Sequence, residues 1–225
     1  MKEIESFAKL SQTEQIYELT EVAKLAAVEF GIKVKDIANV SHSFNSTFYI
    51  TDDKTNKYSL RVNLNFSRDK SAITAEHKWL AEINKWKKIN VPQPIKTLNG
   101  QTYAHVYSKK LEFFLDCTLA HWIEGEEIGD DPTNSQLFEL GRIMALMHDY
   151  SASLSRSDYS GFPDIDSVFM DMQNNLDKTT KISEDLELID LLSRAHKDAE
   201  TAFTDLAAYE SKMLIHADLH MGNVI

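Results

Sequence analysis

The strongest constraint on the fold is a change in hydrophobic period near residue 130. Before this point lie three segments with the β-branched and aromatic composition of strands, residues 37–64, 95–108 and 110–123. After it, apolar residues recur at helical spacing over 133–149, 165–180 and 184–209. Strands followed by helices, instead of alternating with them, predict an α+β fold and not a doubly wound parallel sheet.

The first part of the chain also contains two helical patterns, over residues 12–30 and 70–89. Gly31 is a natural stop for the first helix, and Asn99-Gly100 predicts a turn within 95–108. The expected organisation is three consecutive parts: a β-rich lobe over 1–120, a hinge over 121–130 and a helical lobe over 131–225. The junction falls near HWIEGEEIGDDP, a stretch rich in Gly, Pro and acidic residues.

Charge is divided unevenly along a chain whose net charge is −11. Residues 1–111 contain 17 Lys or Arg and 12 Asp or Glu, whereas residues 112–225 contain 7 and 23. The acidic second half predicts that nucleic acid is not a partner, because it would repel phosphates, and it would attract a cationic small molecule. A solvated acidic helical surface explains the same charge without any ligand.

Cys117 is the single cysteine, so an intramolecular disulfide is impossible, and its apolar neighbours predict a small buried residue. The N-terminus has no apolar run of signal-peptide length, and no segment reaches the roughly 18 apolar residues of a membrane helix. The sequence therefore predicts a soluble, cytoplasmic protein with no membrane partner.

The stretch LIHADLHMGNVI, residues 214–225, gathers the side chains that are typical of catalysis. Asp218 and Asn223 are five residues apart, which suits a base that faces a hydroxyl and an amide oxygen that faces a divalent metal ion. Such a pair serves phosphoryl transfer, and the spacing H-x-D-x-x-x-x-N matches the catalytic loop of kinases. The glycine-rich GxGxxG and GxxxxGK[ST] phosphate-binding motifs are both absent.

HADLHMGNVI resembles the catalytic loop of the aminoglycoside phosphotransferase and choline kinase superfamily, including a second histidine at His220. Further segments resemble the family in the same order: YSLRVN its third strand, AITAEHKWLAEINKWKKINVPQPI its main helix, LAHWIEGE its hinge and LFELGRIMALMHDYS its first large-lobe helix. The resemblance implies a protein-kinase-like fold of two lobes. One is a small antiparallel β lobe with one main helix, and the other is a mainly helical lobe that is incomplete at its C-terminus.

The resemblance also implies a role for particular residues. Arg61 would bind the nucleotide phosphates and Glu76 would pair with Arg61. Backbone groups of His121 and Ile123 would meet the adenine, and Asn45 would lie in the phosphate-covering turn. Asp218 would act as the catalytic base and Asn223 would bind magnesium.

The expected function is ATP- and Mg²⁺-dependent transfer of the γ-phosphate to a hydroxyl of a small molecule, possible acceptors being a cationic amino sugar or amino alcohol. Two features depart from the family: the turn SHSFNSTFYI has no glycine, and Ala217 replaces a glycine. Ile225 precedes the family's Asp-containing metal motif, so we expect a truncated member in which Val224-Ile225 begins a strand. Such a fragment would expose apolar patches or form an oligomer, and the sequence does not fix its oligomeric state.

Two other functions remain open at this point. A catalytically incomplete, kinase-like chain could serve as a nucleotide-binding or partner-binding module. Alternatively, His216, Asp218 and His220 alternate on one extended stretch and could hold zinc or a metal pair for hydrolysis.

Overall fold

The computed structural model describes residues 7–43, 45–64, 70–129, 131–165, 185–208, 213–219 and 223–225. Its main elements in chain order are α2 (Gln12–Glu29), β1 (Val34–His42), β2 (Asn45–Asp52), β3 (Lys57–Asn63), α3 (Lys70–Trp86), β4 (Pro94–Ile95), β5 (Ala104–Ser108), β6 (Phe113–His121), α4 (Asn134–Ala152), the 3₁₀ helix η1 (Arg156–Tyr159) and α6 (Leu186–Ala207). The helix expected over 165–180 falls on residues outside the described ranges. None of the described helices combines the length and apolar character needed to cross a membrane.

All strand pairings in the sheet are antiparallel, which confirms the predicted α+β class. The strand order is β1-β2-β3-β6-β4, with β5 beside β6. Alternate residues of β2 are buried, as expected for a strand with one covered face. On the opposite face, the strand register places Arg61 of β3 between Thr47 of β2 and Thr118 of β6. One face of the sheet is therefore apolar, and the other carries polar side chains.

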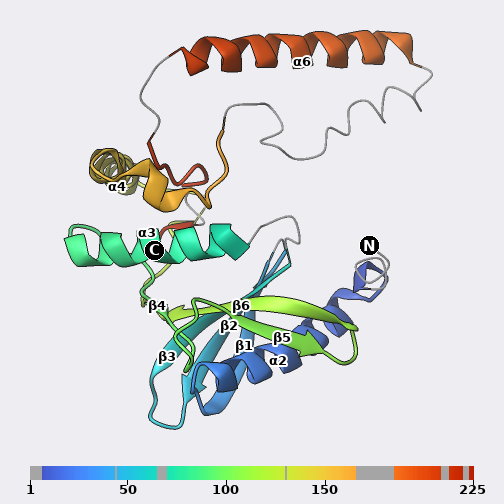
Figure 1. The fold of residues 1–225 in the computed structure, drawn as a ribbon, viewed down its shortest axis with the longest axis vertical. Helices are drawn as coiled ribbons and strands as arrows, with labels where there is room; N and C mark the ends of the chain where they lie inside the picture. Colours follow the sequence, from blue (N-terminus) through green and yellow to red (C-terminus); the bar gives the residue numbers. More distant parts are fainter. Residues whose placement is uncertain are drawn as a thin grey trace.

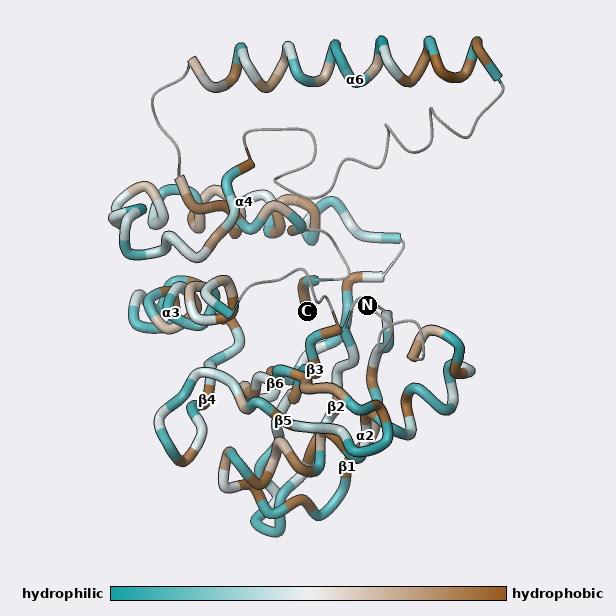
Figure 2. The backbone as a smooth tube through the Cα atoms, turned by 45° about the vertical axis from the view of Figure 1, so that its right-hand side comes forward, coloured by the Kyte–Doolittle hydropathy of each residue, from teal (hydrophilic) through white to brown (hydrophobic). Residues whose placement is uncertain are grey.

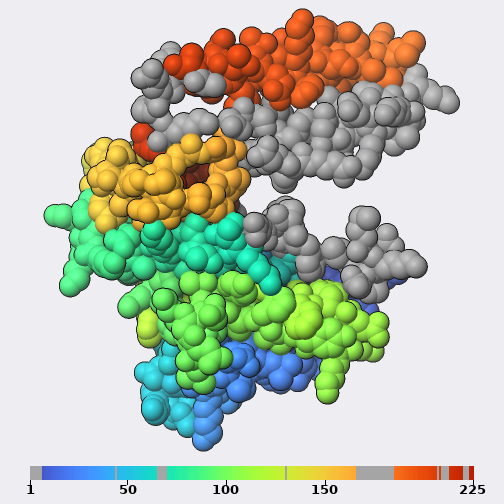
Figure 3. Space-filling model, in the orientation of Figure 1, coloured from blue at the N-terminus to red at the C-terminus, as the bar shows by residue number. Residues whose placement is uncertain are grey.

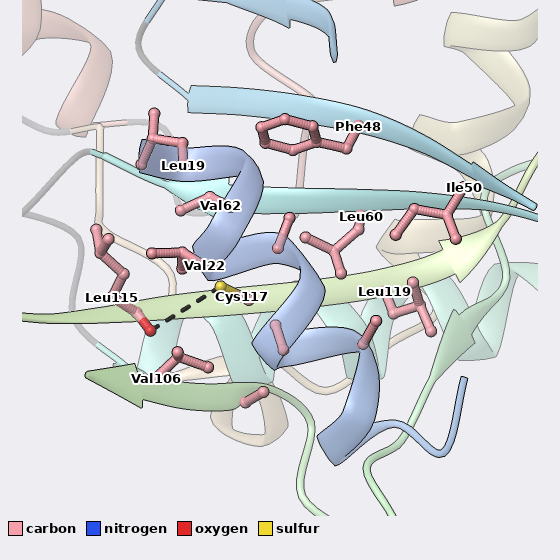
Figure 4. Close-up of a cluster of buried hydrophobic side chains, with 14 of the residues drawn as sticks. Leu19, Val22, Phe48, Ile50, Leu60, Val62, Val106, Leu115, Cys117 and Leu119 are labelled. Carbon is pink, nitrogen blue, oxygen red and sulfur yellow. Dashed lines mark hydrogen bonds between the residues drawn. The ribbon is translucent and has the colours of Figure 1, made fainter. Parts of the chain in front are cut away.

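Helix α2 covers the apolar face of the sheet. Its N-terminus carries a reciprocal capping box between Ser11 and Glu14, and Gly31 follows its C-terminal cap with φ +73°, a conformation that favours glycine. Figure 4 shows side chains of α2 pointing at those of the strands. The fully buried members of this core include Leu19, Val22, Phe48, Ile50, Leu60, Val62, Leu115, Cys117 and Leu119.

A second hydrophobic cluster joins α3 to α4 and η1 on the other side of the sheet. Its buried members are Trp79, Ile83, Met147 and Tyr159. In Figure 1 the layers follow in the order α2, sheet, α3 and α4, and Figure 2 again shows α3 between the sheet and α4. Atoms of α4 lie directly on α3 in the space-filling view of Figure 3. The side chains of α3 thus contribute to the helical cluster and not to the core beneath the sheet.

The segment predicted as a strand over 95–108 is interrupted in the structure. Strand β4 has two residues, and the chain then turns before β5 begins. The turn is closed by Thr97, whose amide donates to the carbonyl of Gln101 at 2.9 Å, and Gly100 adopts φ +77°. The predicted Asn99-Gly100 turn is confirmed. It shortens the first strand because turn residues cannot continue a ladder.

The predicted helices of the second part agree with α4 and α6 within a few residues. Thr133 and Gln136 form a capping box at the start of α4, and the side chain of Asp185 caps α6 at the amide of Leu188. Helix α6 lies beyond α4 from the sheet in Figure 1. Its exposed leucines include Leu186, Leu191 and Leu206.

Candidate active site

The ion pair expected between Arg61 and Glu76 is present. Nη2 of Arg61 donates to both carboxylate oxygens of Glu76, at 2.9 and 3.0 Å. The side chains are 26% and 18% exposed, so water screens this pair less than a surface pair. The contact joins β3 to the middle of α3 across the polar face of the sheet.

Arg61 retains donor capacity beyond this pair. Its Nε is buried and has no hydrogen-bond partner among the described residues, and a buried donor without a partner costs free energy. An anion against this edge of the guanidinium would satisfy the donor. Arg61 therefore fits the phosphate-binding role that the sequence suggested.

His77 follows Glu76 in α3 and is 7% exposed. Burial, which disfavours the charged imidazolium, lowers its pKa to about 4, while nearby Glu76 raises this pKa and Arg61 lowers it. Its Nδ1 is also buried, and no group in the described part of the chain forms a hydrogen bond with it. His77 is therefore neutral at physiological pH, and the charge of Arg61 is balanced by the carboxylate of Glu76.

Asn45 lies at the start of β2, directly after the turn from β1. Its side-chain oxygen accepts a hydrogen bond from the amide of Leu64 at 3.4 Å. The register pairs Asn45 with Asn63, two residues beyond Arg61 on β3. No contact between Asn45 and Arg61 is present, so the assignment of Asn45 to a nucleotide site stays a prediction.

The residues of the predicted hinge continue from β6 and are held on both sides. The His121 amide donates to the carbonyl of Gln93 and the Trp122 amide to that of Lys57, each at 3.1 Å. Within the described ranges, the amide of Ile123 has no hydrogen-bond partner. The hinge therefore offers at least one free backbone donor.

An open pocket of about 350 Å³ borders this hinge. Its walls come from the end of α3, the loop before β4 and the hinge itself: Asn84, Asn90, Val91, Gln93, His121, Trp122, Ile123 and Glu124. Arg61, Asn45, Asp218 and Asn223 are not among these residues. The pocket is therefore lined by the residues predicted to meet the adenine and by none of those predicted to contact the phosphates.

The loop that carries Asp218 is a tight turn. The Asp218 amide donates to the carbonyl of His216 at 2.7 Å, and Ala217 between them has φ +56°. This left-handed conformation is strained for alanine and free for glycine, which gives a physical reason for glycine at this position in the family. His220 lies outside the described residues.

Asn223 returns to Asp218 five residues later. Its Nδ2 donates to the Asp218 carbonyl oxygen at 2.7 Å and to the carboxylate Oδ2 at 3.3 Å, which brings the two predicted catalytic side chains together. This leaves the Asn223 amide oxygen, which together with carboxylate oxygen is the ligand type that Mg²⁺ prefers. The described residues contain no group of three or more His, Cys, Asp or Glu side chains arranged around a metal ion.

Val224 and Ile225 do not form a strand in the structure, so that expectation is wrong. A segment becomes a strand only when another strand bonds to it, and no described strand pairs with these residues. Ile225 lies instead against Gly125 of the hinge, where an added Cβ would be 3.1 Å from the Ile225 Cβ. Leu214 and Leu219 pack against the helical cluster. The loop thus lies between that cluster and the hinge.

Several residues of the site were not identified from the sequence. The rings of Tyr49 and Trp122 meet edge to face at 4.8 Å, and Lys57 forms an ion pair with Glu124. These contacts hold the hinge to β2 and β3. The alternation of β2 places Tyr49 on the polar face, but only the paired register brings it to the hinge.

Comparison with protein families gives a match over residues 36–225 to the model of APH, described as a phosphotransferase enzyme family. No curated protein matches the chain significantly.

Solved structures share the fold. An amicoumacin kinase, hAmiN, in complex with AMP-PNP, Ca²⁺ and Ami has a TM-score of 0.69 and 20% identity over 94% of this chain and 62% of its own. A microcompartment-associated aminopropanol kinase has a TM-score of 0.61 and 20% identity, covering 91% of this chain and 63% of its own. An aminoglycoside phosphotransferase from Alicyclobacillus acidocaldarius has a TM-score of 0.54 and 14% identity, covering 89% and 60%. The chain therefore spans about three fifths of the length of these proteins.

Proposed function

The chain belongs to the phosphotransferase enzyme family, and from that premise we propose that the protein transfers the γ-phosphate of ATP to a hydroxyl group of a small molecule. The observation that carries the proposal is the Arg61–Glu76 contact. It holds a guanidinium on the polar sheet face and leaves its buried Nε free for an anion. Phosphoryl transfer depends mainly on such positioning and charge stabilisation.

The hinge supports adenine as the base. The His121 carbonyl can accept a hydrogen bond, and the free Ile123 amide can donate one. This order complements the 6-amino group and N1 of adenine, whereas guanine presents an acceptor and a donor in the reverse order. ATP is therefore the expected nucleotide.

Asp218 would act on the acceptor. Its carboxylate takes the proton of the hydroxyl as the hydroxyl oxygen bonds to the γ-phosphorus. The bond between that phosphorus and the bridging oxygen breaks, and ADP leaves. Asn223 would hold Mg²⁺ through its amide oxygen, and the bound ion would neutralise phosphate charge.

The acceptor we propose is a cationic amino sugar or amino alcohol. The charge of residues 112–225 supports this class, because this part of the chain contains 23 acidic residues and only 7 basic ones, and so it attracts cations. Two proteins of the same fold are named as kinases of amicoumacin and of aminopropanol. A preference for anionic acceptors in a binding assay would contradict this part of the proposal.

Calorimetric titration of ATP into the chain, with and without Mg²⁺, tests the proposal. Arg61→Ala should weaken binding, and Arg142→Ala is the matched control because it removes an arginine from a surface pair with Glu139 on α4. The same titration with GTP in place of ATP tests the proposed role of the hinge, and GTP should bind more weakly than ATP. Binding that is unaffected by Arg61→Ala would overturn the phosphate role. No binding at millimolar ATP would overturn nucleotide use by this chain and direct attention to a protein partner.

A further inference from the structure

The η1 segment, which we define as residues 156–162, lies against α3. Lys78 of α3 donates to the carbonyl of Asp158 at 3.0 Å, and its ammonium lies 4.9 Å from the ring centre of Tyr159. The ring of Phe162 meets that of Trp79 edge to face at 6.0 Å. Each of these contacts joins α3 to the η1 segment.

Gly161 makes the closest approach of this segment to α3. A Cβ built on Gly161 would lie 2.2 Å from the carbonyl oxygen of Ser71 and 3.1 Å from the amide nitrogen of Ala72. Both are backbone atoms in the first turn of the helix and cannot rotate away. Any side chain at position 161 must therefore displace either α3 or the η1 segment.

Helix α3 also contacts the sheet side of the molecule. The Arg61–Glu76 pair joins α3 to β3, and the hydroxyl oxygens of Thr74 in α3 and Thr102 in the loop before β5 lie 3.4 Å apart. The buried Trp79 and Ile83 belong to the helical cluster, and the core beneath the sheet contains no residue of α3. The packing of Trp79 and Ile83 in the helical cluster therefore helps to fix the position of Glu76.

We propose that the η1 segment is a positioning element that sets the place of Glu76 relative to Arg61. Gly161 is the residue that allows this segment to pack closely on α3. Glu76 lies little more than one turn beyond Ser71, so a shift of the first turn carries its carboxylate along with the helix. The hydrogen bonds of 2.9 and 3.0 Å are near the usual optimum, and a displacement of about 1 Å removes them from bonding geometry. The consequence for nucleotide binding rests on the function proposed above, whereas the effect on the ion pair does not.

A double-mutant cycle tests the positioning directly. The free energies of unfolding of Arg61→Ala, Glu76→Ala and the double variant give the coupling between the two side chains. We expect this coupling in the wild-type background and in Gly141→Ala, a matched control because a Cβ on Gly141 in α4 meets no atom within 4 Å. The coupling should be lost in Gly161→Ala and reduced in Phe162→Leu, which keeps an apolar side chain but removes the ring against Trp79.

Equal coupling in all four backgrounds would overturn the proposal. If Gly161→Ala does not fold, Phe162→Leu decides the outcome, because Phe162 is only partly buried and a smaller apolar side chain is tolerated there. A second readout is ATP affinity: Gly161→Ala should weaken it in the wild type and have no further effect in Glu76→Gln. Absence of ATP binding in the wild type would contradict the proposed function only, and the coupling measurement would still decide the role of the η1 segment.

Discussion

The side-chain nitrogen of Asn223 donates to two oxygens of Asp218, the backbone carbonyl at 2.7 Å and the carboxylate Oδ2 at 3.3 Å. This contact places the proposed base beside the proposed metal ligand. It also closes a loop whose tight turn at Ala217 stores some backbone strain. The two residues are adjacent but have different chemistry, so mutation should separate their effects.

Replacing Asp218 by asparagine should reduce turnover with a hydroxyl acceptor by at least about 100-fold, because the amide cannot accept the hydroxyl proton. ATP affinity should change little, since Asp218 is not proposed to contact the nucleotide. Release of ADP measures the turnover, and calorimetry measures the affinity. A variant with normal turnover would exclude Asp218 as the base.

Replacing Asn223 by alanine should increase the Mg²⁺ concentration at which ATP binding is half-maximal, because it removes the amide oxygen proposed as a metal ligand. Titration of Mg²⁺ at fixed ATP measures this shift. Asp218→Asn is the control, with a predicted shift much smaller than that of Asn223→Ala. An unchanged Mg²⁺ dependence in Asn223→Ala would argue for a purely structural role in closing the loop.

His77 should make the stability of the fold depend on pH. Burial lowers its pKa from an ordinary 6.5 to about 4, so the unfolded chain binds more protons than the folded one between these values. The free energy of unfolding should therefore rise with pH from about 4 to about 6.5, by about 3 kcal/mol from this residue. Above about pH 6.5, the contribution of His77 to the free energy of unfolding should no longer change with pH.

The contribution of His77 is measured as a difference from His77→Phe, which does not titrate. Denaturant unfolding of both proteins at several pH values separates this residue from the carboxylates that titrate in the same range. Parallel curves for the two proteins would contradict the predicted pKa.

The contact between α3 and α4 should contribute measurably to stability. The indole nitrogen of Trp79 donates to the hydroxyl of Ser151 at 3.2 Å, and both residues are buried. Ser151→Ala leaves the indole N–H without a partner and should lower the free energy of unfolding by about 1–3 kcal/mol. Ser153→Ala, at the exposed end of the same helix, should cost less than about 0.5 kcal/mol. Equal losses of stability in Ser151→Ala and Ser153→Ala would show that the buried hydrogen bond contributes no more than an exposed one.

The thiol of Cys117 should be unreactive in the folded protein. The residue is fully buried in the core beneath the sheet, and burial raises the pKa of its thiol, so the thiolate is suppressed. A chromogenic disulfide reagent should modify no cysteine in the native protein and one after unfolding. Rapid modification under native conditions would contradict the packing shown in Figure 4.

The sequence was sufficient to predict the class of the fold and most of its elements. Hydrophobic period and turn residues are local properties, and they indicated α2, α3, α4 and α6 to within a few residues. The same holds for the turn at Gly100, whose φ of +77° suits glycine. The short strand β4 was overestimated, because strand length depends on pairing with a distant segment.

The candidate site was partly predictable for a similar reason. The spacing of Asp218 and Asn223 is local, and their contact follows from it. The pairing of Arg61 with Glu76, 15 residues apart, came from resemblance to a family and is present in the structure. The resemblance indicated His121 and Ile123 of the hinge pocket, but its other walls and the contact of Trp122 with Tyr49 gave no signal in the sequence, because they join residues that are far apart in the chain.

The sequence by itself determined most of the helices and strands, and it indicated which side chains are candidates for phosphoryl transfer. Only the tertiary structure decided how these parts are joined. The amphipathic pattern of α3 requires that one face be buried, but it does not specify the surface that buries it. Packing places Trp79 and Ile83 with α4 and η1, while α2 covers the sheet. That choice depends on the fit between surfaces distant in sequence, and it leaves Glu76 to link the two parts through Arg61.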